Sequence, residues 1–119
     1  MEEVDKVRAF HAKFGFAVAD RPAIPDPAVL EGRRRLIEEE LGEWVAACRD
    51  GNLPAAAREM ADLLYSVLGA AVNMGLDPAR LIAAVHVSNM AKVPNPDGGK
   101  PLKPEGWQPP DESVLLGEE

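Results

Sequence analysis

The sequence has a single cysteine and few aromatic residues, which make up 5% of its 119 residues. One cysteine excludes an internal disulfide, and the place of Cys48 among apolar helix positions predicts a packed thiol instead of a nucleophile. Alanine and leucine dominate the apolar residues, which favours helix over sheet. No stretch alternates regularly between apolar and polar residues, so we expect no strand.

The sequence also lacks a basic excess, because its formal net charge is −7. Nucleic-acid-binding proteins carry basic patches, so we expect no nucleic-acid partner. The chain shows neither the start of a secretion signal nor a charge-free run of membrane length. We therefore expect a cytoplasmic protein without membrane contact. The basic run GRRR at residues 32–35 is either a solvated helix face or includes an arginine that faces phosphate.

Proline, glycine and aspartate divide the first part of the chain into four helical segments. An aspartate followed by proline matches an N-cap and a first helical residue, at Asp26 and again at Asp77. Glycines after the apolar runs end the second and third segments. We expect helices over residues 3–16, 27–49, 54–74 and 78–92.

After Val93 the sequence becomes rich in proline and glycine. This composition predicts a loop or lid followed by a loose acidic tail. The expected fold is all-α: a four-helix, bundle-like domain over residues 1–93, with residues 94–119 as its C-terminal extension.

The second helix carries the acidic stretch EEELGEW at residues 38–44. At about 100° per residue, Glu39, Glu40 and Glu43 share one arc beside an apolar stripe, whereas Glu38 points to the other side. Leu36 lies in the same arc, so this flank is expected to meet another helix. The apolar stripe, expected in the core, consists of Leu30, Ile37, Leu41, Trp44, Val45 and Cys48.

The third helix is apolar on almost every side and is expected to be buried all round. Its few polar residues, Glu59, Asp62, Ser66 and Asn73, fall within an arc of about 60° and form one seam. An unpaired buried carboxylate costs several kcal/mol, so Glu59 and Asp62 require a cation or a hydrogen-bonding partner.

Antiparallel packing of the second and third helices would bring two carboxylate pairs into one cleft. Glu40 and Glu43 are three residues apart, as are Glu59 and Asp62, so each pair converges within a helical turn. Carboxylates this close require counter-charge. An all-oxygen ligand set favours Mg²⁺ or Mn²⁺ over Zn²⁺.

A di-iron bundle is the competing metal site, and it requires Glu-x-x-His motifs on two helices. The two histidines, His11 and His86, do not follow a glutamate at that spacing. Each is either a hydrogen-bonded packing residue or a ligand, and the packing role is favoured.

These carboxylates resemble the E-E-x-x-E…E-x-x-D signature of the all-α nucleoside triphosphate pyrophosphohydrolases, the MazG-like proteins. Dimeric dUTPases and phosphoribosyl-ATP pyrophosphohydrolase are relatives of that superfamily. EELGE at residues 39–43 supplies the first half of the signature, and EMAD at residues 59–62 supplies the second. The stretches FHAKFG (10–15), HVSNMAKV (86–93) and GKPLKPEGWQPPD (99–111) are similar to its Deinococcus-type house-cleaning subgroup.

The resemblance implies cleavage of a (deoxy)nucleoside triphosphate between its α- and β-phosphates, which releases a nucleoside monophosphate and pyrophosphate. It also implies a homodimer, with dUTP favoured as substrate by analogy. The implied metal ligands are Glu40, Glu43, Glu59 and Asp62. Glu39 is a further ligand or the base that deprotonates water, and Glu40 is the other candidate for that base.

The resemblance also implies substrate-binding residues: Asn89, Lys92, Lys100, Lys103, Phe14 and Trp107. Asn89 would face the base or sugar, and Lys92, one turn later, would face phosphate. The two later lysines either fold over the triphosphate or only solubilise the loop. The two aromatic residues either stack on the base or serve in packing.

Two other functions stay open at this point. One is a non-catalytic nucleotide-binding or regulatory helical dimer of the same ancestry, against which the complete carboxylate set argues. The other is an unrelated acidic interaction protein.

Overall fold

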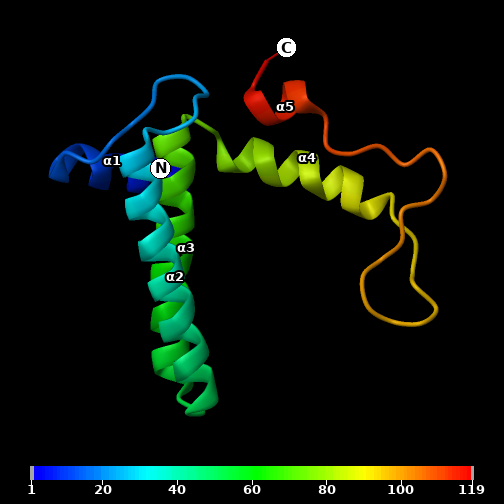
Figure 1. The fold of residues 1–119 in the computed structure, drawn as a ribbon, viewed down its shortest axis with the longest axis horizontal. Helices are drawn as coiled ribbons and strands as arrows, with labels where there is room; N and C mark the ends of the chain where they lie inside the picture. Colours follow the sequence, from blue (N-terminus) through cyan, green and yellow to red (C-terminus); the bar gives the residue numbers. More distant parts are fainter. Residues whose placement is uncertain (1, 119) are drawn as a thin grey trace. The chain divides into compact units, whose positions relative to one another are not determined.

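The computed structural model describes residues 2–118, and its regular elements are helices (Figure 1). The helices are α1 (Glu3–Phe14), α2 (Pro27–Arg49), α3 (Leu53–Met74), α4 (Pro78–Met90) and α5 (Glu112–Leu116). The expected all-α class is therefore confirmed, and α1 to α4 end within two residues of their expected positions. Within residues 2–118, β pairing is limited to an isolated bridge between Val93 and Leu102.

The C-terminal tail differs from the expectation of a loose segment, because it contains α5. Asp111 caps this helix by accepting a hydrogen bond from the Ser113 backbone N–H at 2.9 Å. Gly117 ends it in the left-handed conformation. A side-chain cap and a terminal glycine are together enough to define a short helical turn.

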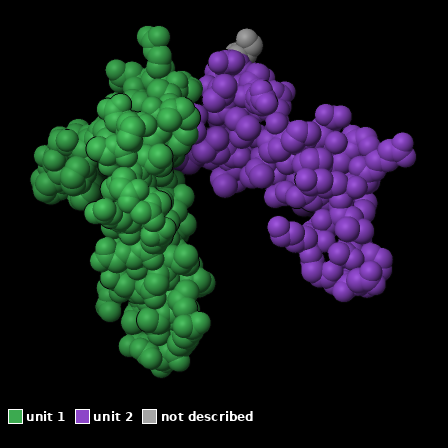
Figure 2. Space-filling model, in the orientation of Figure 1, with its two compact units in different colours: residues 1–75 green, residues 76–119 purple. Residues whose placement is uncertain are grey.

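The chain forms two compact units, Met1–Gly75 and Leu76–Glu119 (Figure 2). The first unit contains α1, α2 and α3, and the second contains α4, α5 and the proline-rich segment between them. The assignment of residues 1–93 to one functional domain stays a prediction.

Local sequence signals determine where the main helices begin. Asn52 accepts a hydrogen bond from Ala55 N at the start of α3, and Asp77 accepts one from Ala79 N at the start of α4. Asp26 occupies the N-cap position of α2, but its side chain makes no capping hydrogen bond. Proline at the first turn of each of these helices costs no hydrogen bond, because the first N–H groups have no partner within a helix.

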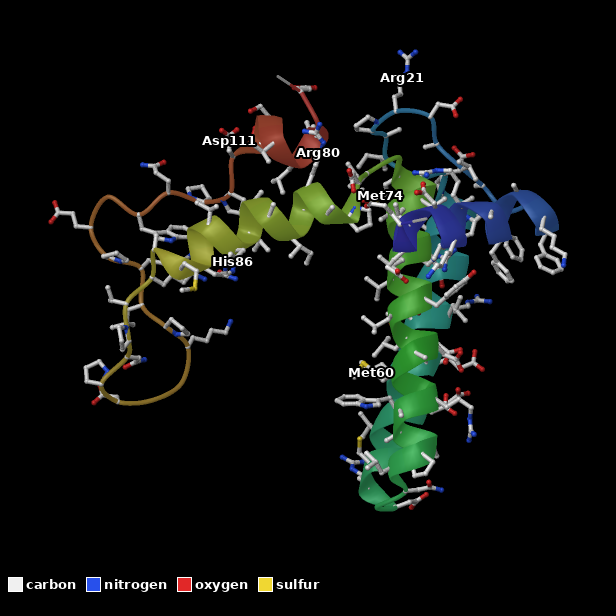
Figure 3. All side chains as sticks on the ribbon, turned by 180° about the vertical axis from the view of Figure 1, so that it is seen from behind. Arg21, Met60, Met74, Arg80, His86 and Asp111 are labelled. Atoms are coloured by element: carbon white, nitrogen blue, oxygen red, sulfur yellow. The ribbon has the colours of Figure 1, made fainter. Side chains whose placement is uncertain are left out.

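The segment between α1 and α2 folds back on the end of α3. Ala19 N donates to the Val72 carbonyl at 3.2 Å, and Ala23 N donates to the Met74 carbonyl at 3.0 Å. Gly75 has φ +67°, and a Cβ at this position would collide with the Arg21 carbonyl. Glycine is therefore required here both by the backbone conformation and by the close approach. The Arg21 side chain itself points away from the helices (Figure 3).

Helices α2 and α3 lie side by side and antiparallel, joined by a short turn (Figure 1). This confirms the expected antiparallel arrangement. The buried apolar residues of the first unit are few and mostly small: Val7, Ala47, Ala56, Ala71 and Val72.

Two expectations about burial are wrong for the isolated chain. Cys48, Leu30 and Leu41 were expected in the core but are exposed. Helix α3 was expected to be buried all round, yet Leu64 is 57% exposed and Val67 is 47% exposed. Within the first unit α3 packs against α1 and α2, and its remaining flank leaves these apolar side chains exposed. No helix among residues 2–118 combines the length and apolar character needed to cross a bilayer.

Candidate active site

Three glutamates from α2 and α3 converge in the first unit. Glu40, Glu43 and Glu59 each offer a carboxylate oxygen, and these oxygens lie within 4.8 Å of one another. One oxygen of Glu40 and one of Glu59 are buried without a hydrogen-bond partner among the described residues. A buried carboxylate oxygen without a partner is costly. The cluster therefore fits a divalent cation, and its all-oxygen donor set suits Mg²⁺ or Mn²⁺.

The electrostatics of the cluster agree with this fit. Burial raises the pKa of Glu40, and the charges of Asp62, Glu59 and Glu39 raise it further. Hydrogen bonding to the Glu59 carboxyl and repulsion from Glu40 raise the pKa of Glu43. Both groups therefore hold a proton more tightly than an isolated glutamate does, Glu40 chiefly because it is buried and Glu43 chiefly because it is hydrogen-bonded to Glu59. A bound cation would replace that proton.

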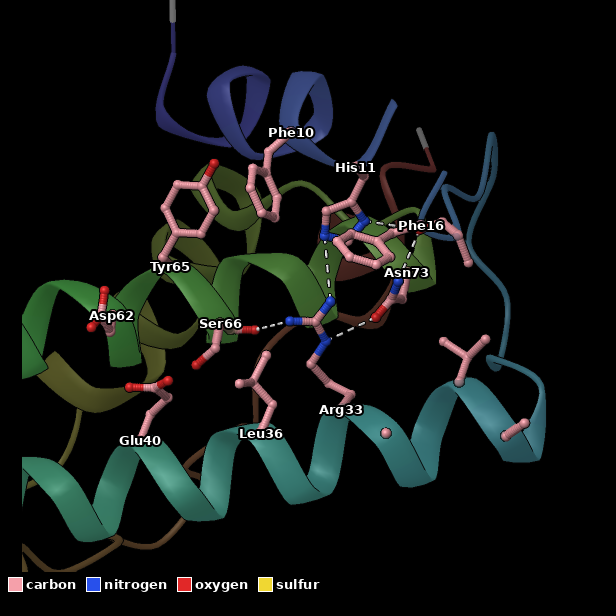
Figure 4. A pocket seen from close by; sticks show the side chains of 14 residues that line it. Phe10, His11, Phe16, Arg33, Leu36, Glu40, Asp62, Tyr65, Ser66 and Asn73 are labelled. Atoms are coloured by element: carbon pink, nitrogen blue, oxygen red, sulfur yellow. Dashed lines mark hydrogen bonds between the residues drawn. The ribbon is translucent and has the colours of Figure 1, made fainter. Parts of the chain in front are cut away.

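The other two predicted carboxylates lie at the border of this cluster. Asp62 lines the same pocket as Glu40 (Figure 4), and its charge acts on Glu40. Glu39 is exposed and lies outside the group of three converging oxygens, although its charge raises the pKa of Glu40 and Glu43. The structure thus gathers three of the five carboxylates and places the other two nearby; their roles as ligands or base stay predictions.

A pocket of about 520 Å³ adjoins the carboxylates. This volume lies within the range of small-molecule binding sites. Figure 4 shows Glu40 and Asp62 toward one end of the pocket and Arg33 toward the other. Aromatic side chains from α1, α3 and the segment after α1 supply much of the remaining lining: Phe10, Phe16 and Tyr65.

Arg33 is half-buried and is held by three hydrogen bonds (Figure 4). Its Nε donates to Asn73 Oδ1 at 3.0 Å, its Nη1 to the Ser66 carbonyl at 3.0 Å, and its Nη2 to His11 Nε2 at 3.3 Å. The guanidinium also packs closely on Gly69, where an added Cβ would lie 2.5 Å from Nη1. Glycine at this position therefore makes room for the arginine.

His11 and Asn73 connect this arginine to the segment that follows α1. Because Arg33 donates to Nε2, the proton of neutral His11 is assigned to Nδ1, which then donates to the Ala17 carbonyl at 3.0 Å. Asn73 Nδ2 donates to the same carbonyl at 2.8 Å. His11, 2% exposed, is thus a hydrogen-bonded packing histidine. His86, in contrast, is exposed on α4 (Figure 3).

The arginines of the basic run at residues 32–35 do not all point the same way, although the run was expected to be either a solvated helix face or to include an arginine that faces phosphate. Arg34 forms ion pairs with Glu31 and Glu38, and Arg35 pairs with Glu31, so both are solvated surface arginines. Arg33 points inward instead. Sequence reasoning did not single out Arg33, although its helical spacing from Leu36 and Glu40 places it on the flank expected to meet another helix.

Phe14, for which both stacking on a base and packing were open, does not line this pocket. It is 54% exposed, and its ring centroid lies 4.9 Å from that of Phe10. The aromatic side chains of the pocket are instead its neighbours Phe10 and Phe16, together with Tyr65.

The second unit gathers three of the predicted substrate-binding residues. Lys92 Nζ lies 5.5 Å from the Trp107 ring centroid, and Lys103 Nζ lies 4.8 Å from it. Trp107 Nε1 donates to the Ser88 carbonyl at 2.7 Å, which fixes the indole. Asn89 and Lys100 are exposed in the same unit.

Residues 7–89 match the family model described as phosphoribosyl-ATP pyrophosphohydrolase. The matched stretch includes all five predicted carboxylates, the lining of the pocket and Asn89. It ends before the lysines and the tryptophan of the second unit. No curated protein matches the chain.

Proposed function

The chain belongs to the phosphoribosyl-ATP pyrophosphohydrolase family, and from this we propose that it is a Mg²⁺-dependent nucleoside triphosphate pyrophosphohydrolase. The proposed reaction cleaves the bond between the α- and β-phosphates and releases a nucleoside monophosphate and pyrophosphate. The observation that carries the proposal is the convergence of Glu40, Glu43 and Glu59 beside a pocket large enough for a nucleotide.

The carboxylates divide into two proposed roles. Glu40, Glu43, Glu59 and Asp62 would hold Mg²⁺, with Mn²⁺ as a substitute. When bound, the ion would neutralise phosphate charge and polarise the anhydride. Two carboxylates are proposed to accept the proton of the attacking water: Glu40, which lines the pocket beside Asp62, and Glu39, whose exposed side chain lies outside the cluster. A Glu39→Gln variant that loses turnover but keeps its Mg²⁺ affinity would assign the base to Glu39.

Lys92 and Lys103 are proposed to contact the phosphates of the substrate. Lys92 and Lys103 flank Trp107, and among the described residues neither lysine forms an ion pair with an acid. Two neighbouring cations without acidic partners are suited to a polyphosphate. Lys100 and Asn89 complete the proposed substrate-binding set.

We propose dUTP as the first substrate to test, in a house-cleaning role like that of the Deinococcus-type MazG-like subgroup. The matching family is described by a different nucleotide, phosphoribosyl-ATP. Both compounds carry the phosphoanhydride that the proposed chemistry requires.

We further propose a homodimer. The first unit exposes Leu41, Leu64 and Val67, and the second exposes Val87 and Met90, each at 45% or more. Apolar side chains gathered on helix flanks are typical of surfaces that another subunit covers.

The deciding experiment incubates the protein and Mg²⁺ with dUTP, dCTP and phosphoribosyl-ATP and measures pyrophosphate and orthophosphate separately. The proposal expects pyrophosphate from at least one substrate, loss of the reaction in EDTA, and a higher melting temperature with Mg²⁺ and a non-hydrolysable nucleotide. Orthophosphate as the product would contradict the cleavage position. Stabilisation by nucleotide without hydrolysis would favour the non-catalytic alternative.

A further inference from the structure

We propose that Arg33 recognises the nucleobase, and that the pocket beside the carboxylates selects bases with a keto oxygen on the edge remote from the sugar. The inference rests on the proposed function, because it takes the triphosphate to lie at the carboxylate cluster. It names a specificity-determining residue that lies outside the acidic signature.

Arg33 carries its charge among neutral hydrogen-bond partners. Its three hydrogen-bond partners are neutral acceptors: the Asn73 amide oxygen, the Ser66 carbonyl and the His11 ring nitrogen. Within residues 2–118, Arg33 makes no ion pair with a carboxylate. A half-buried charge without a partner of opposite sign is costly to maintain. Such an arginine is suited to a ligand that brings an additional acceptor.

Arg33 also retains hydrogen-bond donors that the protein does not use. A guanidinium carries five N–H groups, and three of them are used within the protein. The other two N–H groups have no acceptor among residues 2–118 and could donate to a ligand. Burial lowers the pKa of Arg33, but an arginine remains protonated at neutral pH. The residue can therefore donate hydrogen bonds but cannot accept one.

The position of Arg33 along α2 sets its distance from the carboxylates. Arg33 and Glu40 lie on one side of α2, and a rise of 1.5 Å per residue separates them by about 10 Å along the helix. Figure 4 shows both lining the pocket, with Leu36 between them and Phe10 and Tyr65 across from it. A nucleotide with its phosphates at Glu40 would place its sugar and base along this apolar stretch, with the far edge of the base at Arg33.

The chemistry of the base edges then determines the preference. Uracil, thymine and guanine present a keto oxygen on that edge, whereas cytosine and adenine present an amino group. A keto oxygen accepts from Arg33. An amino group would set a donor against a donor and leave the two remaining N–H groups of Arg33 without an acceptor, which is the kind of mismatch that gives strong discrimination.

The test measures binding of the α,β-imido analogues of dUTP and dCTP by calorimetry in Mg²⁺. The wild-type chain is expected to bind the uracil compound at least about tenfold more tightly, and the guanine analogue more tightly than the adenine analogue. Equal affinities, or a preference for the amino bases, would overturn the proposal without any variant being needed.

Two variants and a control then assign the preference to Arg33. In Arg33→Met the keto preference should shrink to within about twofold, whereas Arg35→Met, an exposed arginine on the same helix, should keep it. Gly69→Ala offers a second route if Arg33→Met does not fold, because its Cβ would displace the guanidinium but retain the charge. A folded Arg33→Met or Gly69→Ala protein with the full preference would refute the role.

Two further outcomes separate this inference from its alternatives. If Arg33 held the triphosphate instead, Arg33→Met would weaken both analogues and inorganic pyrophosphate equally, and the proposal would fail. Keto-selective binding without pyrophosphate release would refute the proposed function but leave this inference standing. Pyrophosphate release with equal kcat/KM for dUTP and dCTP would refute this inference but leave the proposed function standing.

Discussion

Glu43 on α2 and Glu59 on α3 place carboxylate oxygens within 4.8 Å of each other across the antiparallel helix pair. The contact raises the pKa of Glu43, through hydrogen bonding to Glu59 and repulsion from Glu40. Without a cation this arrangement opposes folding, because like charges at such spacing repel. With a cation the same carboxylates become ligands. Removing one charge should therefore change activity and metal-free stability in opposite directions.

Glu59→Gln and Asp62→Asn should each abolish pyrophosphate release. In EDTA both variants should be as stable as the wild type or up to about 1 kcal/mol more stable, because each removes one like charge. Urea unfolding and a pyrophosphate assay measure the two effects. Glu38→Gln, on the outer side of α2, is the matched control and should keep full activity. Wild-type turnover in Glu59→Gln would refute the metal assignment.

Stability should depend on pH through Glu40 and Glu43. Their pKa values are raised in the folded protein above the unfolded value of 4.5. Their contribution to the free energy of unfolding is therefore fully present below pH 4.5, and it is lost as pH rises through the folded pKa values. The metal-free wild type should therefore lose stability relative to Glu43→Gln between about pH 4.5 and 7. Thermal melts of both proteins in EDTA across this range measure the difference.

Mg²⁺ supplies the control for the pH prediction. At pH 7 saturating Mg²⁺ should raise the melting temperature of the wild type more than that of Glu43→Gln, because the variant has lost a ligand. A stability difference between the two proteins that stays constant from pH 4.5 to 7 would contradict the raised pKa of Glu43.

The sequence was sufficient to predict α1 to α4 and the approach of Glu40 and Glu43 to Glu59. Local signals such as the proline after Asp77 act within one turn and so remain visible in the sequence. The polar seam of α3 was equally informative, because Glu59 lies in the cluster and Asn73 holds Arg33.

The burial of α2 and the aromatic lining of the pocket could not be predicted in the same way. Cys48 has the spacing of a core residue, but whether it is covered depends on which neighbours pack there. Phe10, Phe14 and Phe16 are similar in sequence context, and only the fold-back of the segment after α1 decides which of them line the pocket. These properties depend on tertiary contacts that periodicity does not encode.

Asn73→Ala should destabilise the protein by about 2–3 kcal/mol, because Asn73 is buried and bonded on both sides of its amide. Its Oδ1 accepts from Arg33 and its Nδ2 donates to the Ala17 carbonyl. Urea unfolding measures the change. Asn95→Ala, which removes an exposed hydrogen bond to the Lys100 carbonyl, should cost less than about 1 kcal/mol. Equal costs for the two variants would contradict a structural role for the Arg33 network.

Lys92→Met and Lys103→Met should each raise KM for the triphosphate by about tenfold, since each removes a charged contact to phosphate. Their effect on kcat should be smaller if the lysines bind ground state and transition state alike. Lys6→Met is the control, because Lys6 pairs with Glu3 on the surface of α1. An unchanged KM in both lysine variants would remove them from the substrate-binding set.

The sole cysteine offers a direct test of the proposed homodimer. Cys48 is exposed in the isolated chain, and it lies on the same side of α2 as the exposed Leu41. If a second subunit covers this apolar flank, the thiol should react with a disulfide reagent more slowly in the dimer than after dilution to the monomer. The labelling rate is measured over a series of protein concentrations, and light scattering gives the mass at each concentration. The urea-unfolded chain serves as the reference for a fully accessible thiol. A dimer in which Cys48 reacts as fast as in the monomer would place the interface on another surface, such as the flank of α3 that exposes Leu64 and Val67.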